Sequence, residues 1–439
     1  MMDDATIIDA VRRDAVPVDL ETAAQRLLEA IAPNVSMVLI GEATHGTQEF
    51  YRIRADLTRA LVRQRGFDIV AVEADWPDAY RANQWVQLRG SDHTAEDALA
   101  DFTRFPRWMW RNREVVRFLR WLRSENAERR ADARVGFYGL DLYSLHRSMA
   151  RVIEYLDKVD PAAAKRARQG YACFDVFGED VQLYGYAASL NIERSCEDEV
   201  IEQLVDLRRR AAEYATRDGR IAADEYFVAE QNARVVRHAE TYYRAMFRGG
   251  AESWNVRDRH MMETLNRLMD FHGPGAKGIV WAHNTHVGDA RYTDMSRAGM
   301  LNIGQLAREQ HLNEGVVLAG FGSHHGSVIA GKSWGAPMER MKVPEARKGS
   351  WEDVLHQAGG DQLVLFDQDN ISDEIKKPRG HRAIGVVYQA ESESYGNYVP
   401  TILPKRYDAF LYIDETEALH PLHIEPEELK PTDTYPWGV

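Results

Sequence analysis

The chain has 439 residues, of which 44% are hydrophobic and 28% are charged, and its formal net charge is −13. This composition is typical of a globular protein, and the length predicts two or three structural units. The negative charge argues against nucleic acid or an anionic membrane as the main partner, because both require a basic protein surface. No apolar run reaches the roughly eighteen residues that a membrane-spanning helix needs.

The sequence contains only two cysteines, Cys173 and Cys196. So low a count excludes a disulfide framework, and a reducing cytosol is then the simplest location. We therefore expect a cytoplasmic protein.

Short apolar runs alternate with helical patterns in the first third of the chain. Strands are expected at residues 36–40, 67–72 and 134–140, and the segment after the first strand places Phe50, Ile53 and Leu57 at helical spacing. Such β-α-β alternation implies a parallel sheet that helices bury on both faces.

The strand patterns stop between residues 145 and 272, where helical periods dominate. They resume at 278–282 and 316–320, and further strand-like runs follow at 363–366, 383–388 and 409–413. The predicted fold is α/β: a parallel-sheet core with helices on both faces (1–144 and 273–322), a helical insertion (145–272) and a smaller C-terminal α+β portion (323–439). Within the insertion, the aromatic stretch 169–186 is expected to be an irregular lid or pocket wall. The proline-rich tail after residue 420 is expected to be extended.

Four of the predicted strands lead into acidic residues or histidines. In chain order these are Glu42 and His45, then Glu73 and Asp75, then Asp141, and finally His283 and His286. The carboxyl ends of the strands form the ligand crevice of an open parallel sheet. We therefore expect these side chains to share one pocket.

Each of these residues also has a purely structural interpretation. Asp75 and Asp141 fit helix caps, and a single buried histidine such as His283 or His286 is more often a hydrogen-bonded core residue than a catalyst. The tryptophans at 108, 110, 281 and 334 fit packing and a substrate wall equally well. The joint occurrence of Glu42, His45, Glu73 and His283 is what favours a functional site.

Several kinds of chemistry are excluded by missing motifs. The chain has no G-x-S-x-G elbow, no G-x-G-x-x-G after the first strand and no G-x-x-x-x-G-K-[ST], and neither cysteine ends a strand. The stretch HNTH at 283–286 lacks the spacing of H-E-x-x-H. The remaining chemistry is that of histidine and carboxylate acting on water, in which a neutral imidazole removes a proton while Arg54 or a second histidine stabilises the oxyanion.

Five motifs together resemble the erythromycin esterase family: GEATHG at 41–46, GFDIVAVEADWPDA at 66–79, FYGLDLYSLHRSM at 137–149, WAHNTHVGD at 281–289 and YDAFLYIDET at 407–416. The resemblance runs from about residue 20 to 420. It points to the broader branch of the family, which includes members named as succinoglycan biosynthesis proteins. The activity it implies is hydrolysis of a lactone or other carboxylic ester by histidine-activated water without a covalent intermediate. The EADWPDA form of the second motif departs from the pattern of macrolide-cleaving members, so macrolides stay an open alternative among the substrates.

The resemblance also implies roles for individual residues. His45 is the expected general base and Glu42 its motif partner, while Arg54, Glu73 and His283 complete the catalytic set. The residues expected to bind substrate are His286, Asp75, Trp76 and Asp141. We expect a small ester or lactone as partner, and no cofactor, metal, nucleic acid or membrane. Two alternatives stay open: a metal-dependent hydrolase that uses the same His and Glu residues as ligands, and a non-catalytic protein that binds a small ligand such as haem.

Overall fold

A nine-stranded mixed sheet forms the centre of the computed structural model, which describes residues 4–178, 180–190, 195–215, 220–311, 313–366 and 373–423. The strand order is β1-β8-β11-β6-β2-β5-β3-β4, with β7 paired to β6. Strands β11, β6, β2, β5, β3 and β4 pair in parallel, whereas β1, β8 and β7 join antiparallel. The strand bounds are β1 Ala15–Pro17, β2 Met37–Ile40, β3 Ile69–Asp75, β4 Gly136–Asp141, β5 Gly278–Trp281, β6 Val316–Gly331, β7 Met338–Val343, β8 Gln362–Leu365 and β11 Ala409–Thr416.

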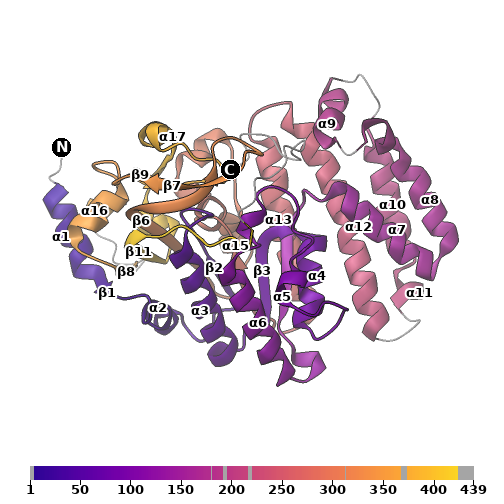
Figure 1. Ribbon diagram of the computed structural model, residues 1–439, viewed down its shortest axis with the longest axis horizontal. Helices are drawn as coiled ribbons and strands as arrows, with labels where there is room; N and C mark the ends of the chain where they lie inside the picture. The colour runs from indigo at the N-terminus through magenta and orange to yellow at the C-terminus, as the bar shows by residue number, and fades with distance from the viewer. Residues whose placement is uncertain are drawn as a thin grey trace.

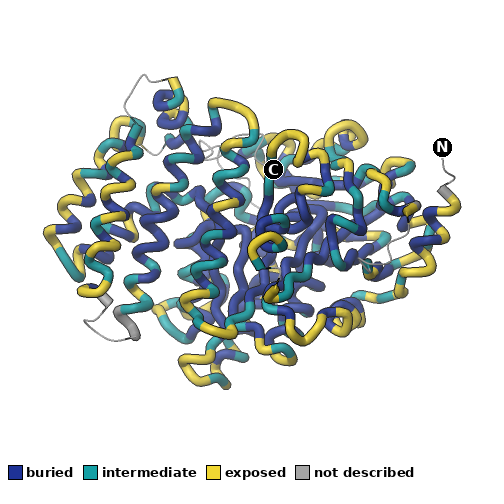
Figure 2. Tube along the Cα trace, turned by 180° about the vertical axis from the view of Figure 1, so that it is seen from behind, coloured by how far each residue is buried: buried dark blue, intermediate teal, exposed yellow. Residues whose placement is uncertain are grey.

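Helices cover both faces of this sheet, because its central strands are apolar on both sides. In β2, Val38 and Ile40 pack on one face, and Met37 and Leu39 pack on the other. Helices α2 (Ala23–Ala30), α3 (Gln48–Arg65), α4 (Trp76–Val86), α5 (Ala95–Ala98) and α6 (Arg113–Ala127) supply most of the first layer. Helices α1 (Asp4–Asp14), α13 (Glu252–His272), α15 (Ile303–Gln310) and α16 (Trp351–Ala358) supply the second. The predicted α/β class is confirmed, and Figure 2 shows the sheet as the buried centre of the molecule.

A long helical section precedes β5 and runs from α7 to α13, residues 145–272. It comprises α7 (Leu145–Val159), α8 (Pro161–Tyr171), α9 (Val181–Ser189), α10 (Glu197–Arg209), α11 (Ala211–Ala215), α12 (Arg220–Met246) and α13. Figure 1 shows α7 to α12 grouped at one end of the molecule, beside the sheet. The stretch 169–186, expected to be an irregular lid, is instead mostly helical, and its Phe174 and Tyr184 are buried in a core of the helical section itself.

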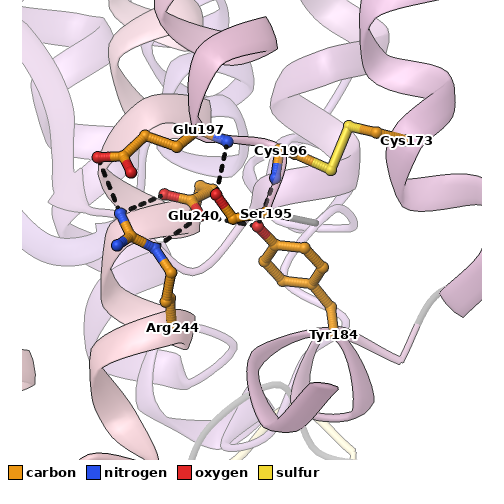
Figure 3. Close-up of a disulfide and its surroundings, with 7 residues drawn as sticks. All are labelled: Cys173, Tyr184, Ser195, Cys196, Glu197, Glu240 and Arg244. Carbon is orange, nitrogen blue, oxygen red and sulfur yellow. Dashed lines mark hydrogen bonds and ion pairs between the residues drawn. A yellow bond between two sulfur atoms is a disulfide. The ribbon is translucent and has the colours of Figure 1, made fainter. Parts of the chain in front are cut away.

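A disulfide joins Cys173 to Cys196 within this helical section, with their Cα atoms 5.9 Å apart (Figure 3). The backbone N–H of Cys196 donates to the Tyr184 hydroxyl at 3.0 Å, and that hydroxyl donates to Glu240 at 2.7 Å. Glu240 also accepts from Arg244. The cysteine count argued against a disulfide framework, but it did not reveal that these two cysteines are bonded to each other. The spacing of 23 residues could not show that the segment just after α8 and the start of α10 meet.

The C-terminal part packs against the central strands. Strand β6 continues eleven residues beyond the predicted 316–320 and pairs with β7 there, while β9 (Arg379–Arg382) and β10 (Tyr398–Thr401) form a separate two-stranded sheet. The predicted strand at 383–388 is absent: Ile384 forms only an isolated bridge to Thr44, and Val387 one to Gly331. The remaining helices are α14 (Asn284–Val287), α17 (Glu393–Gly396) and α18 (Leu403–Arg406). Residues 424–439, most of the tail expected to be extended, lie outside the described residues. In the described part of the chain, no helix is long and apolar enough to cross a membrane.

Candidate active site

A cavity of about 70 Å³ lies at the carboxyl ends of the parallel strands. Of the residues expected from the sequence, His45, Glu73, Asp75 and Asp141 line it. It is also lined by Asp78, Arg104, Tyr143 and Arg257, and by an apolar wall that includes Phe102, Phe105, Met109, Trp110 and Trp334. Glu42, Arg54, His283 and His286 are buried behind this lining, each no more than 1% exposed. The strand-end pattern thus brings the expected residues together, although in two layers.

The loop between β2 and α3 is held by close contact with neighbouring chain segments. A Cβ atom on Gly41 would lie 2.1 Å from Asn284 Oδ1, and one on Gly46 would lie 2.0 Å from the carbonyl oxygen of Ile329. Only glycine fits at such approaches. The two glycines of GEATHG therefore press the loop between the HNTH turn and β6, which fixes the side chains between them.

His45 is oriented by the carboxylate of Glu42. Its Nδ1 lies 2.8 Å from Glu42 Oε1, and both residues are buried. A carboxylate oxygen only accepts, so Nδ1 carries the proton and Nε2 of the neutral ring is a base. Since His45 lines the cavity and its Nε2 has no hydrogen-bond partner among the described residues, this nitrogen is available to a bound molecule.

Arg54 neutralises the other oxygen of Glu42. Its Nη2 lies 2.6 Å from Glu42 Oε2, and its guanidinium stands over the rings of Tyr51 and Trp281 at 4.3 and 5.2 Å. The sequence interpretation gave the oxyanion to Arg54 or a second histidine, and the structure places Arg54 behind the cavity lining, beside Glu42. The arginines that line the cavity are Arg104 and Arg257.

Glu73 is aimed into the cavity by an irregularity in β3. The register between β3 and β4 shifts between Val72 and Asp75, and such a bulge re-aims the side chains beside it. Glu73 Oε2 accepts from the backbone N–H of His283 at 2.8 Å, and Oε1 accepts from Arg257 at 2.7 Å. Burial raises the pKa of Glu73, but the charges of His286 and Arg257 outweigh it and bring this pKa below the ordinary value. Glu73 is therefore a carboxylate.

Arg257 and Asp258, which sequence reasoning missed, connect the site to α13. Arg257 donates through Nε and Nη2 to Asp141 at 3.0 and 2.7 Å, in addition to its bond with Glu73. Both oxygens of Asp258 lie 3.0 Å from His286 Nδ1. One signal was present: Arg257 lies one helical turn before Met261, on the apolar stripe of the helix. A charged residue in line with a buried stripe indicates a buried partner.

His283 is engaged at both ring nitrogens. Its Nε2 lies 3.3 Å from the carbonyl oxygen of Ala43, which can only accept, so Nε2 carries the proton and Nδ1 accepts from the Thr285 hydroxyl at 2.8 Å. Burial and the neighbouring His45 lower the pKa of His283 well below the ordinary value. The ring is thus neutral, and its centroid lies 4.8 Å from that of His45.

His286 and Trp76, expected to bind substrate, are fully buried. His286 stacks on Trp254 with ring centroids 4.6 Å apart, and its Nε2 lies 3.4 Å from Glu73 Oε1. Although burial lowers the pKa of His286, Asp258 and Glu73 raise it above the ordinary value. Trp76 is stacked between Tyr80 and Tyr138 in the core. The structure places neither ring on the cavity surface.

Asp75 and Asp78 form an acidic side of the cavity, at the start of α4. Asp75 Oδ2 accepts from Arg104 at 3.0 Å, and its buried Oδ1 has no hydrogen-bond partner among the described residues. Asp78 is paired with Arg147. Burial, and then the nearby charge of Asp75, raise the pKa of Asp78 to about 7.

The cluster of histidines and carboxylates is arranged as hydrogen-bonded pairs. In the described part of the chain, no three His, Cys, Asp or Glu side chains are placed so that they could hold one metal ion. What the cavity offers is an oriented imidazole, an ionised carboxylate, an aspartate that titrates near neutrality and two arginines. This set is suited to proton transfer and to stabilising negative charge on a reacting carbonyl group.

The chain is similar to several known proteins at low identity. It is 22% identical over 386 residues to an erythromycin esterase type II from Escherichia coli, which covers 83% of this chain and 88% of that protein. It is 21% identical over 296 residues to the putative hydrolase YbfO from Bacillus subtilis (strain 168), covering 63% of this chain and 62%, just under two thirds, of that relative.

Solved structures share the fold along nearly the whole chain. A succinoglycan biosynthesis protein superposes with a TM-score of 0.74 at 20% identity, covering 96% of this chain and 99% of the other. An erythromycin esterase mutant in its open conformation superposes with a TM-score of 0.67 at 18% identity, covering 91% and 95%. The family model of erythromycin esterase matches residues 62–416. Because this match spans most of the sequence, the chain belongs to the erythromycin esterase family.

Proposed function

We propose that this protein is a hydrolase that cleaves a carboxylic ester or lactone with water activated by His45. The observation that carries the proposal is the pairing of His45 Nδ1 with Glu42 at 2.8 Å on the wall of the cavity. It holds the imidazole in the tautomer that a general base requires, with Nε2 directed to a bound molecule. Membership of the erythromycin esterase family supports a hydrolase.

In the proposed reaction, a water molecule bound in the cavity attacks the carbonyl carbon of the substrate while His45 Nε2 takes its proton. The imidazolium that forms is stabilised by Glu42, whose own charge is held in place by Arg54. The carbonyl oxygen becomes negative, and the positive charges nearest to it are those of Arg104 and Arg257 on the cavity wall. Collapse of the tetrahedral intermediate then releases the alcohol and the carboxylic acid without an acyl-enzyme.

Glu73 has a positioning role in this proposal. It faces the cavity as an ionised carboxylate and accepts from the backbone of His283 and from Arg257. A water molecule bound between Glu73 and His45 would be oriented by both groups before attack. His283 and His286 act behind this layer, the first against the ring of His45 and the second against Glu73.

The proposed substrate is a small molecule that combines an ester with apolar surface. The charged side of the cavity faces an apolar wall of aromatic residues, among them Phe105, Trp110 and Trp334. Macrolide lactones are one candidate, because relatives carry the name erythromycin esterase. The cavity volume of about 70 Å³ favours simple esters and small lactones over a macrolide ring in this conformation.

The proposal is tested by assaying a panel of esters and lactones, macrolides included, with wild type and His45→Ala. The matched control is His311→Ala, because His311 is also paired with a carboxylate three residues away, Glu314 at 2.6 Å, but lies outside the cavity. We expect hydrolysis of at least one substrate class, a loss of ~10²–10⁴-fold in His45→Ala, and wild-type rates in the control. Activity that survives in His45→Ala would overturn the assignment.

A further inference from the structure

Asp78 is an acidic residue of the cavity that the proposed reaction has not yet used. Asp78 lies in the first turn of α4, five residues after Glu73, and is 3% exposed. Its only ionic partner among the described residues is Arg147, which contacts Oδ1, so Oδ2 carries no hydrogen bond from that part of the protein. Since Asp78 lines the same cavity as His45, one small group bound there can meet both side chains.

We propose that Asp78 is the general acid of the reaction and protonates the leaving oxygen of the ester. The inference rests on the proposed function above. After His45 has removed the proton of the attacking water, the tetrahedral intermediate breaks its bond between the carbonyl carbon and the alkoxy oxygen. The electron pair of that bond goes to the oxygen, which takes the proton of the Asp78 carboxyl group and leaves as an alcohol. The proton on His45 then passes through water to the Asp78 carboxylate, which restores both groups. The net reaction consumes one water molecule per turnover.

The surroundings of Asp78 keep a proton on it near neutral pH. Burial and the charge of Asp75 raise its pKa to about 7, against the opposing charges of Arg147 and Arg104. A group that titrates there can both donate a proton and regain it within a catalytic cycle. Glu73, whose pKa is lowered, cannot donate.

The other acidic groups of the cavity each bond to an arginine, and Arg104 and Arg257 remain positively charged on the cavity wall. Arg257 bonds to Asp141 and Glu73, and Asp75 accepts from Arg104. Arg147, on α7, also donates to the backbone carbonyl of Asp101, which holds its guanidinium beside Asp78. Asp78 and His45 both line the cavity, and an acid and a base that act on one substrate must share a site in this way.

A leaving-group series tests this role. Alkyl esters and lactones expel a basic alkoxide that needs a proton, whereas para-nitrophenyl esters expel a stable anion that does not. We expect Asp78→Asn to lower kcat for alkyl esters by ~10²–10⁴-fold and to change it for para-nitrophenyl esters by no more than about threefold. Asparagine keeps the acceptor for Arg147, so the fold is retained. The matched control is Asp92→Asn, another aspartate paired with an arginine (Arg81, 2.7 Å) but outside the cavity.

A pH series provides a second measurement that does not remove Asp78. Asp75→Asn takes away a charge that raises the pKa of Asp78, so the alkaline fall in kcat for alkyl esters should move to lower pH. Arg147→Gln takes away a charge that lowers this pKa, so the same fall should move to higher pH. Shifts in these opposite directions, with no such shift in the pH profile for para-nitrophenyl esters, support an acid at position 78.

Failure of this inference can be told apart from failure of the proposed function. If Asp78→Asn slows alkyl and para-nitrophenyl esters equally, or neither, while His45→Ala still abolishes hydrolysis, Asp78 is not the acid but His45 remains the base. If His45→Ala hydrolyses the panel as wild type does, or wild type hydrolyses none of it, both conclusions are overturned.

Discussion

Arg54 and His45 lie on opposite sides of the same carboxylate, that of Glu42, at 2.6 and 2.8 Å. Arg54 belongs to α3, whereas Glu42 and His45 belong to the loop before it. The helix therefore fixes the carboxylate, and the carboxylate fixes the imidazole. A buried charge network of this kind is stable only when every member is present, because removing one member leaves another buried without its partner.

Glu42→Gln should lower kcat of the folded protein, and it should also lower the free energy of unfolding because Arg54 is left buried without its counter-charge. Glutamine keeps an oxygen that accepts from His45 Nδ1, but it lacks the charge that stabilises the imidazolium formed when water is deprotonated. We expect a loss within the ~10²–10⁴-fold that a general base supplies. Kinetics of Glu42→Gln, Arg54→Gln and the double variant measure the coupling: the two losses should be far from additive, and strict additivity would contradict the network.

Glu73→Gln should lower kcat more than it raises KM. The amide oxygen can still accept from the backbone N–H of His283, but the charge that balances Arg257 and His286 is lost. The measurement is a kinetic comparison of the purified folded variant, with circular dichroism as the check on folding. A folded Glu73→Gln protein with wild-type kcat would reassign Glu73 to a purely structural pair.

The pair of His286 and Asp258 predicts a pH dependence of stability. The folded pKa of His286 is raised, so its contribution to stability is fully present below the ordinary histidine value and is lost as the pH rises through the raised value. The free energy of unfolding, measured with urea from pH 6 to 9, should therefore decline on the alkaline side. Asp258→Asn removes the charge that raises this pKa and should move the decline to lower pH. Asp270→Asn, an exposed change on the same helix, is the control, and identical pH profiles for the two variants would contradict the assignment.

The cavity-lining residues His45, Glu73, Asp75 and Asp141 could be predicted because each closely follows a predicted strand. Val38 and Val72 lie in short apolar runs, and the polar residues after them must gather where parallel strands end. The depth of each residue could not be predicted, since a strand end does not show which side chain turns toward the cavity and which toward the core. Arg54 and His286 face away from it for that reason.

Long-range partners were beyond the reach of sequence patterns. Arg257 meets Glu73 across 184 residues, and its helix reads as an ordinary amphipathic one apart from a charge on the apolar stripe. The prediction of a strand at 383–388 was wrong although the run alternates as a strand does. Ile384 and Val387 form only isolated bridges, to Thr44 and Gly331. The apolar residues of this run are buried without strand pairing: Ile384 and Tyr388 share a core cluster with side chains of β6 and β7.

Reduction of the disulfide should destabilise the helical section without abolishing catalysis. The bond closes a loop of 23 residues, for which chain-entropy arguments give about 3 kcal/mol. Cys173→Ser should therefore lower the melting temperature, and a reducing agent should lower that of wild type but not of the variant. Thiol titration of the protein taken from cells shows whether the bond forms there. Two free thiols would fit the reducing compartment expected from the cysteine count. A melting temperature that Cys173→Ser does not change would contradict the stabilising role.

Prolonged chelation should leave hydrolysis unchanged. A metal ion would need lone pairs that are already in use: Nδ1 of His45 bonds to Glu42, both ring nitrogens of His283 are engaged, and Glu73 accepts from Arg257. His45 could not be a ligand through Nε2 and also act as base, because a ligated imidazole has no lone pair left for a proton. The measurement is metal content and kcat before and after chelation, for wild type and for His311→Ala as a control outside the site. Activity that falls with the loss of an ion and returns when the ion is added back would make these residues ligands and the protein a metal-dependent hydrolase.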